Sequence, residues 1–489
     1  MKKIFIFLAA AAAALLLSLS AGAADITGSA AFSPSDPAVA DGNEATRSVY
    51  GKGSMITVRS DVPIAAVYVK FDREPPEWTL SANGVSVRRG RYGFWHEFCD
   101  LAALGGPARE VTLHFDTEKA EICDIYVFSE GDIPDWVQRW QPAEGYSDLV
   151  LLSTHADDEQ LFFLGVLPYY AGEMGYEVQV VYFTNHLNTR NRPHELLNGL
   201  WTVGVRRYPV IGALGDYWDG YNETLEYSYS AAAREGISRD DLIAFQVAVL
   251  RRFRPQVVVG HDINGEYGHP QHKINTDTLI PALAFAANAS YMPESAAVYG
   301  VWDVPKTYLH LYGENRIIMD WDRPLSRFGG MTAYEVSKLG YACHLSQQYA
   351  WFTDWINGKY GQYTKATDIR SYKPTEYGLY RSLVGADAVG GDFFENLTVR
   401  STLSPETGPA ASTEPAETDL PVTLPVTEPP LTDAPESICV TTAVAGNAGD
   451  DRISAAAVTA VIGVILLAAA CFAIFKMKKT GKQFFRFLS

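Results

Sequence analysis

Residues 148–161 read DLVLLSTHADDEQL, an apolar run that ends in one histidine and three consecutive acidic residues. The apolar part predicts a buried strand, and the residues from Asp158 onward predict a helix. Three adjacent carboxylates repel one another and tolerate burial only where a positive charge neutralises them. We interpret the missing positive charge as a metal ion.

The same alternation of strands and helices continues through residues 146–398. It indicates a Rossmann-like α/β fold, with a mostly parallel open sheet and helices on both faces. Ligands of such sheets bind beyond the carboxyl ends of the strands, where residues 154–159 lie. The predicted strands are residues 148–155, 177–184 and 256–261, and the predicted helices are residues 158–173, 192–204, 241–253, 270–287 and 329–352.

A second polar cluster follows the predicted strand that ends near residue 260. It reads GEYGHPQH over residues 265–272, and its Pro270 suits the first turn of a helix. His269 would cap that helix, and His272 would lie in its first turn, where the helix end favours neutral imidazoles. We assign His155, Asp158 and His272 as ligands of Zn2+, with another divalent ion such as Fe2+ as the alternative. The competing interpretation is that the three acids only stabilise a helix N-terminus.

The two motifs resemble the signatures of the PIG-L (LmbE-like) de-N-acetylases, H-P-D-D-E and a later H-P-D-H. The resemblance covers residues 148–397 and extends to R-x-x-E-L at residues 192–196 and H-x-S-Q at residues 344–347. Two positions depart from the pattern: Ala156 replaces the usual proline, and Gln271 stands where the family often has aspartate. Neither is a ligand position, so we expect altered loop rigidity or substrate preference.

The resemblance implies zinc-dependent removal of N-acetyl groups from N-acetylglucosamine-type sugars. It places the metal on the three assigned ligands and makes Asp157 the general base. Tyr267 and His269 are then candidates for stabilising the oxyanion or protonating the leaving amine. Arg192 resembles the arginine that binds sugar hydroxyls, and its alternative is a surface charge at a helix start.

Residues 24–145 contain short strand patterns rich in valine, isoleucine and aromatic residues, which predict an all-β sandwich. The segment DGNEATRSVY, residues 41–50, resembles discoidin-type carbohydrate-binding modules. The alternative is a purely structural sandwich that packs on the next domain. Cys99 and Cys123 both lie in this part and could form a disulfide in an exported chain.

The two ends of the chain predict export and anchoring. Residues 1–23 have the lysines, apolar stretch and small residues of a signal peptide cleaved near Ala23 or Ala24. Residues 399–452 form a linker rich in proline, threonine and glutamate, which should be extended. Residues 453–475 would form a helix of about 35 Å, long enough to span a membrane. The basic residues 476–489 would stay in the cytoplasm, so we expect a type I cell-membrane protein with an extracellular catalytic domain.

The composition excludes some partners. The net charge of −17 over 489 residues argues against nucleic acid, although the acidic linker adds to this total. A nucleotide is disfavoured because the first strand–helix turn has no G-x-G-x-x-G and carries acids that would repel phosphate. Two hypotheses remain: a de-N-acetylase, and a non-catalytic surface glycan-binding protein whose α/β domain is a relic.

Overall fold

The computed structural model describes residues 22–187 and 189–402, all within one compact unit. None of the helices in these ranges has the length and apolarity needed to cross a membrane. The predicted signal peptide, except its last two residues, lies outside the described residues. So do the linker from residue 403 onward, the predicted membrane helix and the basic tail.

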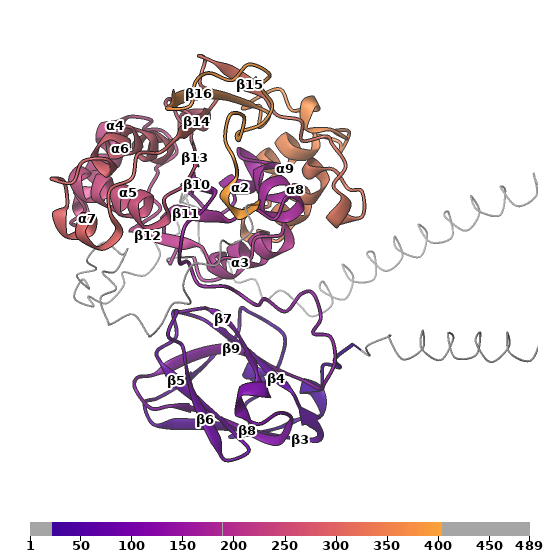
Figure 1. The fold of residues 1–489 in the computed structure, drawn as a ribbon. Coiled ribbons are helices and arrows are strands. Elements are labelled where there is room, and N and C mark those ends of the chain that lie inside the picture. The colour runs from indigo at the N-terminus through magenta and orange to yellow at the C-terminus, as the bar shows by residue number, and fades with distance from the viewer. Residues whose placement is uncertain (1–21, 188, 403–489) are drawn as a thin grey trace, which may run out of the picture. The chain divides into compact units, whose positions relative to one another are not determined.

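Two antiparallel sheets form the N-terminal β-rich part (Figure 1). On β3, alternate residues point inward: Ile56 and Val58 are buried while Met55 and Arg59 are exposed. The five-stranded sheet is ordered β1(Ala31–Ser33), β3(Ser54–Ile64), β8(Ala108–Phe115), β5(Trp78–Ala82), β6(Val85–Arg89). The four-stranded sheet is ordered β2(Ser48–Tyr50), β9(Ala120–Phe128), β4(Ala66–Phe71), β7(His96–Asp100).

One hydrophobic core joins these two sheets, which makes them a sandwich as the sequence predicts. It contains Ile56 of β3 in one sheet and Val67 of β4 in the other. Cys99 and Cys123 are both buried, and both are free thiols, so the disulfide that the sequence allows is not formed.

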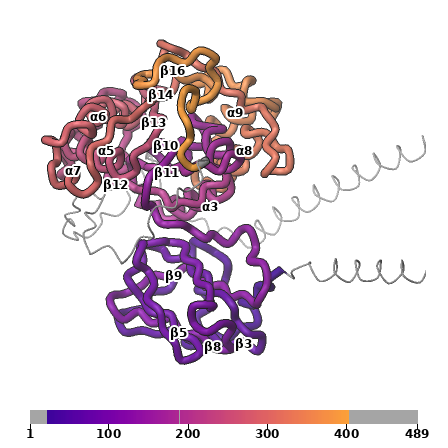
Figure 2. Tube along the Cα trace, viewed as in Figure 1, coloured from indigo at the N-terminus to yellow at the C-terminus, as the bar shows by residue number. Residues whose placement is uncertain are grey.

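A seven-stranded sheet follows, in which five successive strands run parallel to one another. The order is β12(Val210–Leu214), β11(Val178–Thr184), β10(Leu149–Ser153), β13(Val257–Gly260), β14(Lys306–His310), β16(Glu376–Ser382), β15(Arg316–Ile318). Only β16 and β15, at one edge, pair antiparallel with their neighbours. Figure 2 follows the chain through β11, β10, β13 and β14, which confirms the predicted mostly parallel sheet.

Helices cover both faces of this sheet (Figure 1). On β10, Leu149 and Leu151 belong to one hydrophobic core, while Val150 and Leu152 belong to the other. A strand buried on both sides in this way is apolar along most of its length, which explains the run LVLL at residues 149–152. The first core holds α2(Asp158–Leu161), α3(Arg192–Thr202), α8(Ala333–Ala342) and α9(Ala350–Asn357). The other holds α4(Leu225–Arg234), α5(Arg239–Phe253) and α6(Pro270–Ala286), and α7(Pro293–Tyr299) packs on α5.

The predicted helix over residues 158–173 was wrong in length. Helix α2 ends at Leu161, and only a separate π-helical turn, Pro168–Glu173, follows it. Gly165 lies between the two with φ 88°, a left-handed conformation that glycine adopts easily. A Cβ at this position would lie 2.4 Å from the ring of Trp321, so the tight packing of that ring also requires glycine.

The predicted helix over residues 329–352 is likewise interrupted. Helix α8 ends at Ala342, a short 3-10 turn covers Leu345–Gln347, and α9 starts at Ala350. At the break, His344 Nε2 lies 2.9 Å from Glu159 Oε1, a buried contact that ties the segment to the loop after β10. The helical conformation of α8 thus ends just before His344, the residue whose side chain contacts Glu159 at the candidate site.

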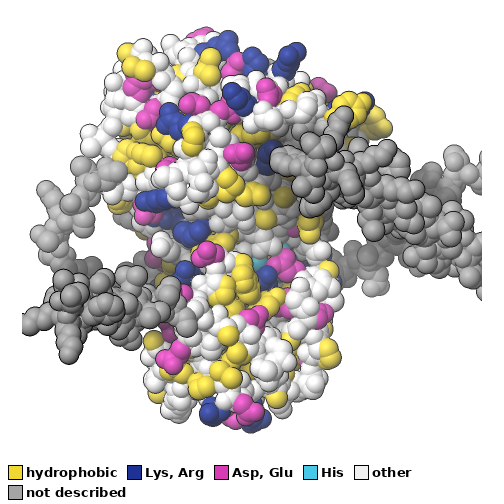
Figure 3. All heavy atoms as spheres, turned by 90° about the vertical axis from the view of Figure 1, so that its right-hand side faces the viewer, with side chains coloured by type: hydrophobic (Ala, Val, Ile, Leu, Met, Phe, Trp, Pro, Cys, Tyr) yellow, Lys and Arg dark blue, Asp and Glu magenta, His cyan; other side chains and the backbone are white. Residues whose placement is uncertain are grey.

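The surface carries both signs of charge. On the face shown in Figure 3, lysine and arginine side chains are interspersed with aspartate and glutamate.

Candidate metal centre

The polar loops after β10 and β13 meet at one edge of the sheet. The two strands are parallel neighbours, so their carboxyl ends lie side by side. The chain places β11 and β12 on one side of β10, and β13 and β14 on the other. This reversal of strand order is the topological switch point at which open α/β sheets bind ligands.

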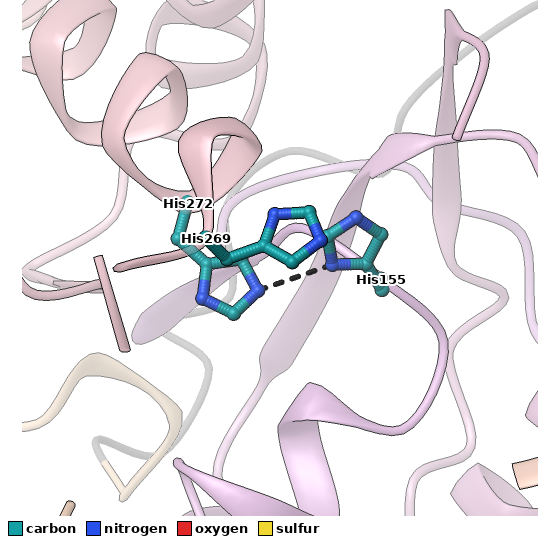
Figure 4. A group of neighbouring side chains, drawn as sticks. All are labelled: His155, His269 and His272. Carbon is teal, nitrogen blue, oxygen red and sulfur yellow. Dashed lines mark hydrogen bonds between the residues drawn. The ribbon is translucent and has the colours of Figure 1, made fainter. Parts of the chain in front are cut away.

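Side-chain atoms of all three predicted ligands converge here. Figure 4 shows two of these ligands, His155 and His272. His155 Nδ1 and His272 Nε2 each lie 3.3 Å from Asp158 Oδ2, and the two nitrogens are 3.1 Å apart. Ligands bound to zinc at 2.0–2.2 Å in a tetrahedron would be separated by about 3.3–3.5 Å. The residues therefore fit a tetrahedral ion with one position left for water or substrate.

Hydrogen bonds fix the histidine tautomers that metal binding requires. His155 Nε2 donates to Gln271 Oε1 over 3.1 Å, and the Gln271 orientation is set because its Nε2 donates to Gly215 O over 2.7 Å. His272 Nδ1 donates to Glu266 Oε2 over 2.8 Å. Both contacts occupy the other ring nitrogen, so the nitrogen that faces Asp158 can bind a metal once it has lost its proton, as in many metal sites.

The electrostatics of this group favour a cation. Burial acts to lower the pKa of His272, but Asp158 and Glu266 outweigh it and raise that pKa to about 10. The pKa of Asp158 is held well below its usual range, because His272 and His155 overcome the opposing effect of burial. A proton therefore stays between these ligands at neutral pH. A bound divalent cation would take the place of this positive charge.

Two further groupings of possible ligands share these histidines. In one, nitrogens of His155, His269 and His272 lie within 4.8 Å of one another. In the other, His261 joins Asp158 and His272. His261 is unsuitable as a ligand, because its Nδ1 lies 2.8 Å from Glu266 Oε2 and its Nε2 accepts from Thr154 N over 3.0 Å. Asp158 completes the better site because it adds an anionic oxygen between the two nitrogens.

Asp157 lies beside the ligands in a strained conformation. Its φ of 122° is rare for a residue with a side chain, and such strain gathers at functional sites. The backbone N of Asp157 donates to Glu159 Oε2 over 2.9 Å, and Glu159 in turn contacts His344, so this carboxylate supports the loop by hydrogen bonding. Burial raises the pKa of Asp157 to about 7, although Arg192 opposes the rise. A carboxylate of this kind suits a general base near neutral pH.

Comparison with known proteins places these residues in a family. Residues 150–283 match the PIG-L family, described as GlcNAc-PI de-N-acetylase. A 1D-myo-inositol 2-acetamido-2-deoxy-alpha-D-glucopyranoside deacetylase from a Nocardioides species is 30% identical over 214 residues, which cover 38% of this chain and 69% of that protein. The chain belongs to the PIG-L family.

Two other similar proteins carry related names. Deacetylase 2 for the same inositol glycoside, from Saccharopolyspora erythraea, is 31% identical over 177 residues, or 32% of this chain. The match spans 63% of the length of that relative. The solved N,N'-diacetylchitobiose deacetylase of Pyrococcus horikoshii, complexed with its inhibitor MPG, is 17% identical with a TM-score of 0.33, covering 48% of this chain and 83% of that one.

Arg192, the predicted sugar-binding residue, begins α3 and faces inward in this PIG-L protein. It is 7% exposed, so the alternative of a surface charge is wrong. Its Nη1 lies 3.0 Å from Asp216 Oδ2, and its Nη2 donates to Ala156 O over 3.0 Å and lies 3.5 Å from Asp157 Oδ1. Arg192 thus holds the loop after β10, and its contact with a sugar stays a prediction.

His269 and Tyr267 lie on the loop that leads into α6. His269 caps α6 as expected, because its Nδ1 accepts from Gln271 N over 3.2 Å. Its ring centroid lies 4.5 Å from that of His155, and the Tyr267 ring lies 5.6 Å from that of His272. Burial lowers the pKa of His269 and raises that of Tyr267 well above its usual range. Both side chains are therefore neutral and carry a proton that can be donated.

Sequence reasoning missed two carboxylates that organise the centre. Asp216 follows β12 and contacts Arg192, with its other oxygen 3.5 Å from His155 Nε2. Glu266 is fully buried and accepts from His261, His272 and His310, the last over 2.6 Å. The signal for Asp216 was its place after a parallel strand. Glu266 lies within the quoted GEYGHPQH, where nothing distinguishes it from an ordinary loop acid.

Proposed function

We propose that this protein is a metal-dependent hydrolase that removes N-acetyl groups from N-acetylglucosamine-type sugars or glycans at the cell surface. The observation that carries the proposal is the convergence of His155 Nδ1, Asp158 Oδ2 and His272 Nε2 within 3.3 Å of one another, next to Asp157. The names of the family relatives, which are sugar deacetylases, support the reaction class.

The residue types suit the hydrolysis of an amide. Zn2+, or Fe2+ as the alternative, would be held by the three ligands and would supply a Lewis acid that polarises the carbonyl and lowers the pKa of water. Asp157 would accept a proton from the attacking water and deliver it to the amide nitrogen as the C–N bond breaks. Tyr267 and His269 would donate hydrogen bonds to the oxygen that gains negative charge. The products are acetate and a free amino sugar.

Acetate release from a panel of defined N-acetyl sugars tests this function. We expect turnover by the metal-loaded wild type, and Asp157→Asn should lower kcat by about 10²–10⁴-fold while keeping the metal. Asn keeps the size of the side chain but has no basic carboxylate. Tight glycan binding by the wild type without any acetate release would instead favour the non-catalytic glycan-binding protein.

The location is the second part of the proposal. It is supported by the signal-like residues 1–23, the apolar residues 453–475 and the basic residues that follow them. Protease added to intact cells should cut the proline-rich linker and release a fragment that ends between residues 401 and 450 and keeps all the activity. Activity found only in the cytosolic fraction would contradict the surface location.

A further inference from the structure

A band of aromatic side chains leads from the metal centre to the protein surface. It starts at Trp218, whose ring centroid lies 4.5 Å from that of His269. Trp218 is 5.7 Å from Tyr267, and Tyr267 is 5.4 Å from Trp351 on α9. We call Trp218, Tyr267 and Trp351 the aromatic band. Its continuity with the candidate metal ligands makes it part of the same site.

The outer end of the band is unusually exposed for its residue type. Trp351 is 50% exposed, and Tyr349, just before α9, is 57% exposed. One turn further along α9, Trp355 is buried and packs against Phe162 at 5.4 Å. The helix thus uses one tryptophan for the core and leaves the other exposed to solvent. Large aromatic side chains left in water beside a functional centre are characteristic of binding surfaces.

The charges around the band favour a neutral occupant. Asp216 and Asp157 lie at its inner end, and Asp354 is exposed on α9. Arg192, the basic residue at this end, already contacts both inner carboxylates. The outer end of the band, where the exposed charge is that of Asp354, therefore suits a neutral group, and the C–H face of a pyranose ring packs well on an aromatic ring.

We propose that Trp351 forms a second sugar subsite, which stacks on the pyranose ring next to the N-acetylated sugar at the metal. This inference rests on the proposed function and narrows its substrate to chains of two or more sugar rings. Binding energy from this remote ring would help to position the acetamido group for hydrolysis.

The test compares Trp351→Ala with the wild type on three probes: methyl N-acetylglucosaminide, N,N'-diacetylchitobiose and octyl N-acetylglucosaminide. We expect the variant to lower kcat/KM for the disaccharide by about five- to tenfold and to leave the one-ring methyl glycoside within about twofold. Trp351→Phe should restore most of the difference, because it keeps an aromatic face. Leu339→Ala, at an exposed position of α8, is the control and should change neither substrate.

Equal losses on the methyl glycoside and the disaccharide would overturn the subsite. A larger loss on the octyl glycoside than on the disaccharide would also overturn it, because the occupant would then be an apolar chain. Calorimetric binding of the same probes separates this inference from the proposed function. If no probe releases acetate, the proposed function fails, and the subsite stands only if Trp351→Ala still selectively weakens disaccharide binding.

Discussion

The candidate metal centre and the contact between α3 and the β-sandwich are built from the same kinds of residue, but their charges are balanced differently. In the contact, His96 Nε2 lies 2.8 Å from His194 Nδ1, and His194 Nε2 lies 3.8 Å from Cys123 Sγ. Glu44 and Asp72 lie close enough to make two more groups that could hold a metal. We call these five residues the interface cluster.

Each acid of the interface cluster already has a cationic partner. Glu44 Oε1 lies 2.6 Å from Lys70 Nζ, and Asp72 contacts Arg190 over 2.8 Å and also pairs with Arg47. The histidines are also satisfied. His96 Nδ1 donates to Gln138 Oε1 over 2.7 Å, so its Nε2 accepts from His194.

At the candidate metal centre, by contrast, Asp158 has no lysine or arginine partner among the described residues and contacts only histidines: His155, His261 and His272. The nearby Arg192 forms ion pairs with Asp157 and Asp216 instead. Residue type and proximity are therefore shared by the two clusters. What differs is that the acids of the interface cluster pair with lysine and arginine, whereas Asp158 faces histidines that could bind a metal.

The strongest test of this comparison is metal content. Wild-type protein should carry close to one equivalent of a divalent ion, and His272→Ala should lose most of it. Activity should fall by more than the roughly 10–100-fold typical of changes beside a ligand. His194→Ala, the matched change in the interface cluster, should keep the full equivalent. Two equivalents in the wild type, with one lost in His194→Ala, would show that both clusters bind metal.

A smaller effect is expected from Glu266→Gln. The carboxylate accepts three histidine N–H groups, and an amide presents only one accepting oxygen. His272 would lose its fixed tautomer, so metal affinity should fall by about 10–100-fold in a chelator competition assay. Glu110→Gln, which alters an exposed ion pair with Arg59, is the control. Unchanged affinity in Glu266→Gln would mean that the ligand geometry does not depend on this carboxylate.

The sequence predicted those parts of the molecule that depend on local pattern. Apolar runs such as residues 148–153 gave the strands of the parallel sheet, and the loops that follow two of them brought His155, Asp158 and His272 together. The break at Gly165 could not be predicted, because it depends on Trp321 from a distant segment. The partnership of His96 with His194 joins the β-sandwich to α3; His96 lies in no motif, and His194 occupies an unspecified position of R-x-x-E-L.

The smallest effect we predict is on the pH dependence of stability, and it concerns the interface cluster. Burial lowers the pKa of both His96 and His194, so the two side chains are neutral in the folded protein. The unfolded chain takes up protons below about pH 6.5, and the folded protein does so only at lower pH. Stability is therefore complete above about pH 6.5 and falls as the pH drops from there through the folded pKa values.

The matched variant for this effect is His194→Asn, whose amide NH₂ can replace His194 Nδ1 as a donor to His96. It removes one titrating group, so the loss of stability on acidification should shrink by about 1.4 kcal/mol for each unit by which burial lowers the His194 pKa. Thermal unfolding at pH 7.5 and pH 5.5 measures this as a smaller drop in Tm, by a few degrees at most for a chain of this size. The metal must be kept saturating at both pH values, because protonation of the ligand side chains at low pH also weakens metal binding. An identical drop in both proteins would mean that the interface histidines titrate normally and that the cluster is open to water.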